Sequence, residues 1–232
     1  MATLNDPNNA SNIAQVGAVS TATTQNPLHV VNRPIPQGAY GHYRISVVTG
    51  TLSAALAASA QVFQFKNTDA SRLAVVTSII AKFMPLTPFT AATLTDHTSF
   101  DAFIARNYAS GGGGTTTTLT GNNAKMRTAH ATPASIINVS QTAALTAATT
   151  LDANPFAQSL RKGNRVNPAA GTEEVLQDAF SWLGFKPDVA SGESPLVLAQ
   201  NEGFVIRNRT VWPVAGTGIL SVQVAWAEVA AY

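Results

Sequence analysis

Leu220-Ser221-Val222-Gln223-Val224-Ala225-Trp226-Ala227 is the stretch that decides the fold, because apolar side chains alternate in it with polar or small ones. Successive side chains of a β-strand point to opposite faces of a sheet, so a period of two predicts a strand with one buried face. This is the cleanest such pattern in the chain. We therefore expect a long final strand that lies centrally in a β-sheet.

Further strands are predicted upstream from alternating patterns and from runs of β-branched and aromatic residues. They cover residues 42–47, 61–66, 72–83, 100–108, 135–140 and 203–209. Pro85 and Pro88 are expected to end the third of them, because proline cannot donate a hydrogen bond within a sheet. Short strands separated by glycine and proline turns predict a mainly β fold, an antiparallel β-sandwich or jelly-roll-like domain. The strand–helix alternation of a parallel sheet is missing from the sequence.

One short helical insertion is predicted at residues 172–184. Thr172 suits an N-cap, and Glu173 and Glu174 place negative charge in the first helical turn. The apolar positions that would share one helical face are Val175, Leu176, Ala179, Phe180 and Leu183. Gly184 stands where helices commonly end, so the expected helix stops there.

Residues 1–40 are predicted to form an extended N-terminal arm, followed by a β-sandwich body at residues 41–232. The arm is rich in Asn, Thr, Ser and Gln, and Pro27, Pro34 and Pro36 interrupt regular structure. A disordered, solvated tail is one interpretation, but such a tail needs few apolar residues. The arm has several, and we take the following as candidate assembly contacts with the body or a neighbouring subunit: Ile13, Val16, Leu28, Val30, Val31 and Ile35.

Charged residues are scarce in this chain. They form 11% of the 232 residues, against about 25% in an average soluble domain. Interface cores are depleted in charge, so the deficit fits a surface that neighbouring subunits cover. A surface of small polar residues such as Thr, Ser and Asn is the other interpretation, and composition alone leaves both open.

The composition also limits the kinds of chemistry and of binding partner that the protein can have. There is no cysteine, which excludes disulfides, thiolate catalysis and cysteine-based zinc sites. The net charge is +2, and the one cationic cluster, Arg161, Lys162 and Arg165, is expected to be solvated, so no direct nucleic-acid partner is predicted. The N-terminus lacks a signal-peptide pattern and no run approaches 18 apolar residues, so no membrane partner is predicted either.

The sequence contains no recognisable catalytic or metal-binding pattern, so we predict no catalytic residue, no cofactor and no metal site, and a protein that is not an enzyme. None of the four histidines lies in a metal-binding motif, and there is no G-x-S-x-G nucleophile elbow. Asp96, His97 and Asp101 could hold a cation, and a turn with a solvated histidine is the alternative. Glu228, near the end of the final strand, is expected to form a structural ion pair with an arginine such as Arg207.

Six stretches of the sequence form a distinctive combination. They are Gly38–Tyr43, Val62–Phe65, Asp69–Ala74, Leu119–Thr128, Leu198–Arg207 and Trp226–Val229. This combination resembles virion structural proteins of tailed bacteriophages, in particular a head decoration or cement-like group. The resemblance covers most of residues 35–130 and 195–232, whereas residues 150–195 depart from it.

The resemblance implies a structural role on the outer surface of a phage head. Such a protein would be made in the cytoplasm of the host bacterium and would bind the major capsid protein of the assembled head, as a homo-oligomer, often a homotrimer. The arm would reach a neighbouring subunit. Two alternatives stay open: a tail, fibre or host-surface-binding component with a ligand near Gly111–Thr118, and a virion-borne glycan hydrolase, which would need a pair of acids in a cleft.

Overall fold

A computed structural model of the chain describes residues 3–4, 14–15, 40–53, 56–87, 99–108, 114–146, 150–159, 166–167, 172–173, 181–188, 192–212 and 216–230. The chain divides into two compact units, Met1–Arg33 and Pro34–Tyr232. In the first unit, β1 (Thr3–Leu4) pairs antiparallel with β2 (Ala14–Gln15). The remaining strands belong to the second unit.

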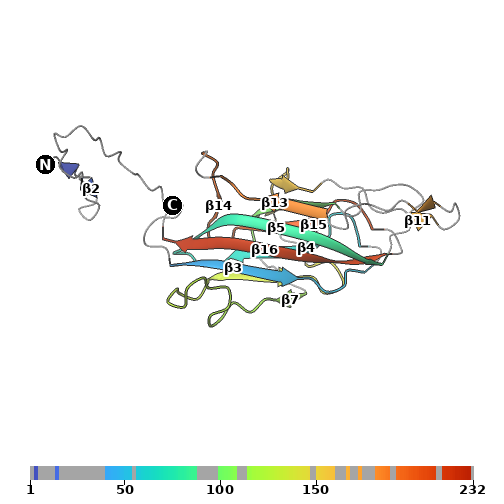
Figure 1. Ribbon diagram of the computed structural model, residues 1–232, viewed down its shortest axis with the longest axis horizontal. Helices are drawn as coiled ribbons and strands as arrows, with labels where there is room; N and C mark the ends of the chain where they lie inside the picture. The colour runs from blue at the N-terminus through green and yellow to red at the C-terminus, as the bar shows by residue number, and fades with distance from the viewer. Residues whose placement is uncertain are drawn as a thin grey trace, which may run out of the picture. The chain divides into compact units, whose positions relative to one another are not determined.

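The first large sheet of the second unit, here called the front sheet, has the strand order β13–β5–β16–β3. Its strands are β3 (Gly41–Val48), β5 (Leu73–Thr87), β13 (Ser181–Phe185) and β16 (Thr217–Val229), and the short β14 (Leu196–Leu198) also pairs with β5. Figure 1 shows β16 running between β3 and β5. The prediction of a long final strand in the centre of a sheet is confirmed.

The second large sheet, here called the back sheet, has the order β10–β6–β15–β4–β8–β7, with β9 also paired to β6. Its strands are β4 (Gln61–Asn67), β6 (Phe100–Asn107), β7 (Thr115–Thr116), β8 (Ser135–Val139), β9 (Thr150–Leu151), β10 (Ala157–Gln158) and β15 (Gly203–Asn208). In Figure 1, β4 and β15 lie behind the front sheet. Two further strands, β11 (Val166–Asn167) and β12 (Thr172–Glu173), pair only with each other.

The chain crosses repeatedly between the two sheets. β3 and β5 lie in the front sheet whereas β4 and β6 lie in the back sheet, and β15 and β16 again fall in different sheets. Apart from β7 and β8, strands that neighbour each other in these two sheets are therefore not consecutive in the chain, and every pairing is antiparallel. The predicted antiparallel β-sandwich is confirmed.

The core between the sheets is built around aromatic side chains. Trp226 of the front sheet stacks on Tyr43 with 5.2 Å between ring centroids, and meets the edge of Phe65 from the back sheet at 5.3 Å. Phe204 stacks on both Phe63 and Phe65. All five are buried, and such ring pairs favour offset or edge-to-face arrangements that add to the energy of burial.

The predicted helix at residues 172–184 is wrong for every described residue in that range. Thr172 and Glu173 form β12, and the segment from Ser181 to Phe185 forms β13, while residues 174–180 lie outside the described residues. β13 pairs with β5 over five positions and buries Leu183 in the core. Pairing with the edge of β5 outweighs the weak intrinsic helix preference of the segment.

The prediction that Pro85 ends the third strand is also wrong, because β5 continues to Thr87. Pro85 pairs with Gly218 at a register irregularity between Thr217 and Gly218, where the ladder does not require its missing N–H. A Cβ on Gly218 would lie 2.2 Å from the ring of Phe83, so only glycine fits beside that ring.

Candidate interaction surface

The back sheet is covered on its outer face. Gln64, Phe103 and Val205 alternate with core residues along β4, β6 and β15, yet each is buried. The Gln64 side chain donates a hydrogen bond of 2.7 Å to the carbonyl oxygen of Thr146, and Leu151 packs against the cluster that contains Phe103 and Val205. The chain that follows β8 therefore helps to close this face.

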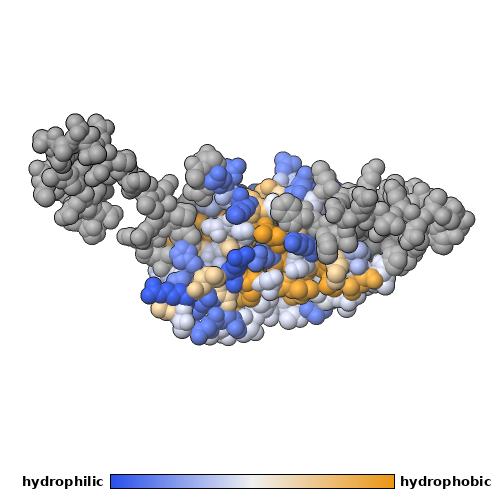
Figure 2. Space-filling view, viewed as in Figure 1, coloured by the Kyte–Doolittle hydropathy of each residue, from blue (hydrophilic) through white to orange (hydrophobic). Residues whose placement is uncertain are grey.

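The front sheet is open over much of its outer face. Along β16, Leu220, Val222 and Val224 are buried in the core, whereas Ser221 and Gln223 between them remain half-exposed. The open area, here called the sheet face, contains Arg44, Ser46, Val48, Ser78, Ile80, Lys82, Met84, Ile219, Ser221, Gln223 and Ala225. Figure 2 shows apolar side chains along this face, interrupted by hydrophilic ones.

The register of the strands arranges the sheet face in rows. Val48, Ser221 and Lys82 lie opposite one another on β3, β16 and β5. The next row contains Ser46, Gln223 and Ile80, from the same three strands. Side chains of residues opposite one another in adjacent strands are close enough to act together on one ligand.

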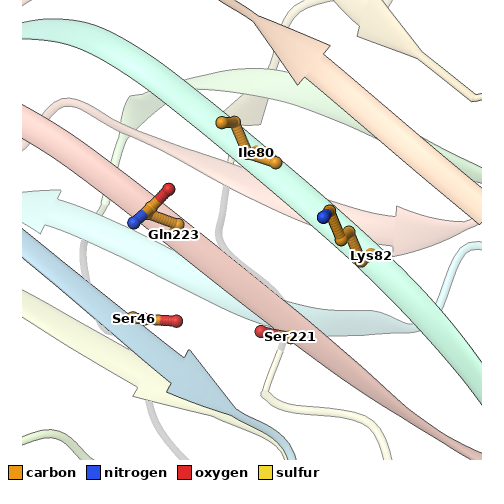
Figure 3. Close-up of a pocket in the computed structure, with 5 residues that line it drawn as sticks. All are labelled: Ser46, Ile80, Lys82, Ser221 and Gln223. Atoms are coloured by element: carbon orange, nitrogen blue, oxygen red, sulfur yellow. The ribbon is translucent and has the colours of Figure 1, made fainter.

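A shallow hollow of about 590 Å³ lies over these two rows. It is lined by Ser46, Ile80, Lys82, Ser221 and Gln223, whose side chains come from three adjacent strands (Figure 3). Hydroxyl and amide groups can donate as well as accept hydrogen bonds, whereas the Lys82 ammonium only donates and carries a positive charge, so a negatively charged acceptor complements the hollow. Its lining residues include neither a carboxylate nor an imidazole.

The charges of the sheet face all have one sign. Lys82 and Arg44 are exposed on it, and no described carboxylate forms an ion pair with either side chain. Arginine and lysine remain charged at neutral pH. The face is therefore apolar and neutral-polar in the main, with two cations that have no described carboxylate partner.

Asp101, which the sequence placed in a possible cation cluster, is engaged by an arginine instead. Arg209 donates two hydrogen bonds to its carboxylate, one from Nε at 3.1 Å and one from Nη2. Asp96 and His97 lie outside the described residues. Among the described residues, no group of three or more His, Cys, Asp or Glu side chains is arranged to hold a metal ion.

Glu228 forms the predicted structural ion pair, but with Arg72 and not with Arg207. Its Oε2 lies 3.2 Å from Nη1 of Arg72, just before β5. Arg207 is on the back sheet, where its guanidinium carbon lies 3.7 Å from the ring centroid of Phe103. The sequence indicated the acid and its role but could not indicate which of several arginines the fold brings to it.

The Glu228 carboxylate also accepts hydrogen bonds from a segment of the other sheet. The backbone N–H of Ala134 donates to it at 2.9 Å and the Ser135 hydroxyl at 3.2 Å, both at the start of β8 in the back sheet. Burial raises the pKa of Tyr43 to about 12, and the nearby Glu228 charge adds to that rise. Glu228 thus ties the two sheets together at one end of the sandwich.

His42 and His130 form a second titratable pair, on β3 and on the segment beside it. Their ring centroids are 5.6 Å apart, and Nδ1 of His130 accepts a bond of 3.1 Å from the His42 backbone N–H. Burial lowers the pKa of His42 below its ordinary value of 6.5, and the electrostatic interaction with the nearby His130 lowers it further. A lowered histidine pKa means that folding favours the neutral ring.

We expect the thermal midpoint to fall as pH drops from about 7.5 to about 5, because the unfolded chain then binds a proton that folded His42 resists. The stability tied to His42 is full above pH 6.5 and is lost as pH falls toward the folded-state pKa. Scanning calorimetry on the wild type and His42→Gln measures this, and the variant should show a shallower dependence. Equal slopes for both proteins would contradict it. Asp69 and Asp152, whose pKa values are lowered from 3.8, titrate below this window.

Several of the predicted residues lie outside the part of the chain that the structure describes. The candidate assembly contacts Ile13, Val16, Leu28, Val30, Val31 and Ile35 lie outside the described residues, as do Arg161, Lys162, Arg165 and residues 111–113. Of the predicted loop, Thr115 and Thr116 form β7. No helix in the described ranges has the length and hydropathy that crossing a membrane requires.

The residues of the sheet face were not predicted as a site. The sequence did contain an indication of them, since Ser221 and Gln223 are the polar positions of the alternating stretch. The alternation shows that one side of the strand is outside the core, but not whether other parts of the chain cover that side.

Comparison with family models, curated proteins and solved structures gives no match to this chain.

Proposed function

We propose that this chain is a structural virion protein of a tailed phage, a decoration or cement protein on the outer surface of the head that acts by binding and not by catalysis. The observation that carries the proposal is the sheet face, which is open and poor in charge while the opposite sheet is covered. Surface patches with few charges and exposed apolar side chains such as Val48 are typical of contacts between proteins.

The strand order supports a jelly roll, and we infer that fold for the body. The eight strands of such a jelly roll would be, in chain order, β3, β4, β5, β6, β10, β13, β15 and β16. Numbered one to eight in that order, the strands of the front sheet follow the order 1-8-3-6, which is β3–β16–β5–β13. The strands of the back sheet follow the order 2-7-4-5, which is β4–β15–β6–β10. Viral capsid proteins use this fold, as do lectins and cupins, so it agrees with a virion role but does not establish it.

The proposed mechanism is thermodynamic. A protein that binds the assembled shell and not free capsid subunits stabilises the shell by mass action. We propose that it binds the major capsid protein as a homotrimer, with the residue 1–40 arm adding contacts to a neighbouring subunit. The low charge of the whole sequence, 11%, agrees with a surface that is largely covered in the assembly.

Electron microscopy of the purified protein mixed with bare, mature phage heads tests the proposal. We expect regular density at symmetric sites on the shell, which would also reveal the oligomeric state. A variant lacking residues 1–36 should occupy fewer sites at equal concentration, and equal occupancy would contradict the role of the arm. Heads that stay bare would overturn the decoration role and direct attention to a tail or host-contact role, for which a glycan-binding screen is the next experiment.

A further inference from the structure

We propose that the hollow on the sheet face receives a carboxylate from a different protein, with Lys82 as its charged partner and Ser46, Ser221 and Gln223 as hydrogen-bond donors. The inference rests on the proposed function and deepens it, because it states which chemistry the shell must present at the contact: an aspartate or glutamate side chain on its outer surface.

The hollow is built to complement an anion with several acceptor oxygens. Lys82 and Ser221 lie opposite each other on β5 and β16, and Gln223 and Ser46 lie opposite each other on β16 and β3. Figure 3 shows these side chains around one space, with Ile80 among them. A carboxylate has two oxygens that accept hydrogen bonds, and bonds to an ionised acceptor are stronger than neutral ones. The apolar surface of Ile80 helps to exclude water from such a bond.

Six of the chain's described carboxylates have partners away from the sheet face. Those in ion pairs with arginine side chains are Asp69, Asp101, Asp152, Glu202 and Glu228. Glu193 accepts a bond of 2.7 Å from the backbone N–H of Asp188, within one turn. No described carboxylate lies within ion-pair distance of Lys82, and we therefore assign the complementary charge to another molecule.

A second copy of this chain is a poor source for that charge through the same face. A symmetric contact would place the face of one copy against the same face of the other, so that Lys82 and Arg44 would meet cations. Like charges brought together at an interface oppose association. Under the proposed function, we assign the occupant to an acidic position on a different protein, the capsid, and contact with a different face of a second copy is an outcome that the self-association measurement below would reveal.

Charge reversal at Lys82 tests the inference in full-length protein. We expect Lys82→Glu to weaken binding to bare, mature heads on the order of 30-fold, and Lys82→Gln to weaken it less, because repulsion replaces attraction only in the former. Arg127→Glu is the matched control, with the same change of charge at an exposed position of the segment beside β3, and it should bind as the wild type does. Lys82 is exposed, so an unchanged thermal midpoint is expected and confirms that each variant folds.

Co-sedimentation with heads at increasing salt supplies a second readout, the dependence of each protein's affinity on salt, which a partly unfolded fraction of a variant would not change. Wild-type affinity should fall with salt more steeply than that of Lys82→Gln, since screening acts on the ion pair. If the wild type binds heads and Lys82→Glu binds them equally tightly, this inference is overturned while the decoration role remains supported. A wild type that does not bind heads would overturn both. Loss of self-association in Lys82→Glu, with head binding kept, would identify a second copy as the occupant and would also overturn it.

Discussion

Replacement of Glu228 by alanine is expected to lower the free energy of unfolding by about 3–5 kcal/mol, the range measured when one partner of a buried ion pair is removed. The Glu228 side chain is 0% exposed, and its loss leaves the Ala134 N–H and the Ser135 hydroxyl without this acceptor, while Arg72 keeps only its more exposed partner Asp69 at 3.3 Å and the Thr132 carbonyl oxygen. Buried donors without partners are costly because water no longer replaces the lost bond. Urea denaturation followed by tryptophan fluorescence measures the change.

An exposed ion pair of this protein provides the control. Arg106 lies 2.9 Å from Asp152 and 3.6 Å from Glu202, and its side chain is 49% exposed. Exposed pairs are screened by solvent and contribute little, so Arg106→Ala should change the free energy of unfolding by less than about 1 kcal/mol. If Glu228→Ala costs no more than Arg106→Ala, the carboxylate is not the tie between the two sheets that its contacts indicate.

The second large effect is expected at Phe204, in the centre of the back sheet. Its ring packs 5.6 Å from Phe63, 5.3 Å from Phe65 and 6.2 Å from Phe156, measured between centroids, and the residue is 0% exposed. Phe204→Ala removes these contacts and leaves a cavity, which should lower the free energy of unfolding by about 3–5 kcal/mol. The same urea titration measures it.

Val211 is the matched control for an apolar truncation, because it is 59% exposed. Val211→Ala should change the free energy of unfolding by less than about 0.5 kcal/mol. Phe204→Leu should fall between the two variants, since it keeps apolar volume but loses ring stacking. A Phe204→Ala variant as stable as Val211→Ala would show that Phe204 does not lie in a packed core.

Neither Glu228→Ala nor Phe204→Ala should change the chemistry of the sheet face, so both can serve as controls for the binding experiments. Glu228 and Phe204 lie away from the hollow lined by Lys82, Ser221 and Gln223. The folded fraction of Phe204→Ala at low temperature should therefore bind heads as tightly as the wild type, whereas fully folded Lys82→Glu should bind them on the order of 30-fold more weakly. This contrast separates loss of binding through unfolding from loss of binding through charge.

The region around residue 181 shows why one class of prediction failed. Thr172, the acidic pair after it and Gly184 satisfy the local requirements of a helix, and a sequence pattern reports only local requirements. The segment from Ser181 to Phe185 instead pairs with β5, about 100 residues earlier in the chain. The benefit of that pairing depends on an exposed strand edge that the local sequence cannot reveal.

The sequence by itself determined the β class, most strands of the core and the place of the last strand, because alternation such as that from Leu220 to Ala227 is a local property that burial of one face requires. Tertiary structure alone decided that Glu228 meets Arg72, that residues 181–185 form a strand, and that the Lys82 side of the front sheet stays open while the back sheet is covered. Those outcomes depend on which distant segments come together. Antiparallel pairing across a sandwich is set by long-range register and packing, which no short stretch of sequence contains.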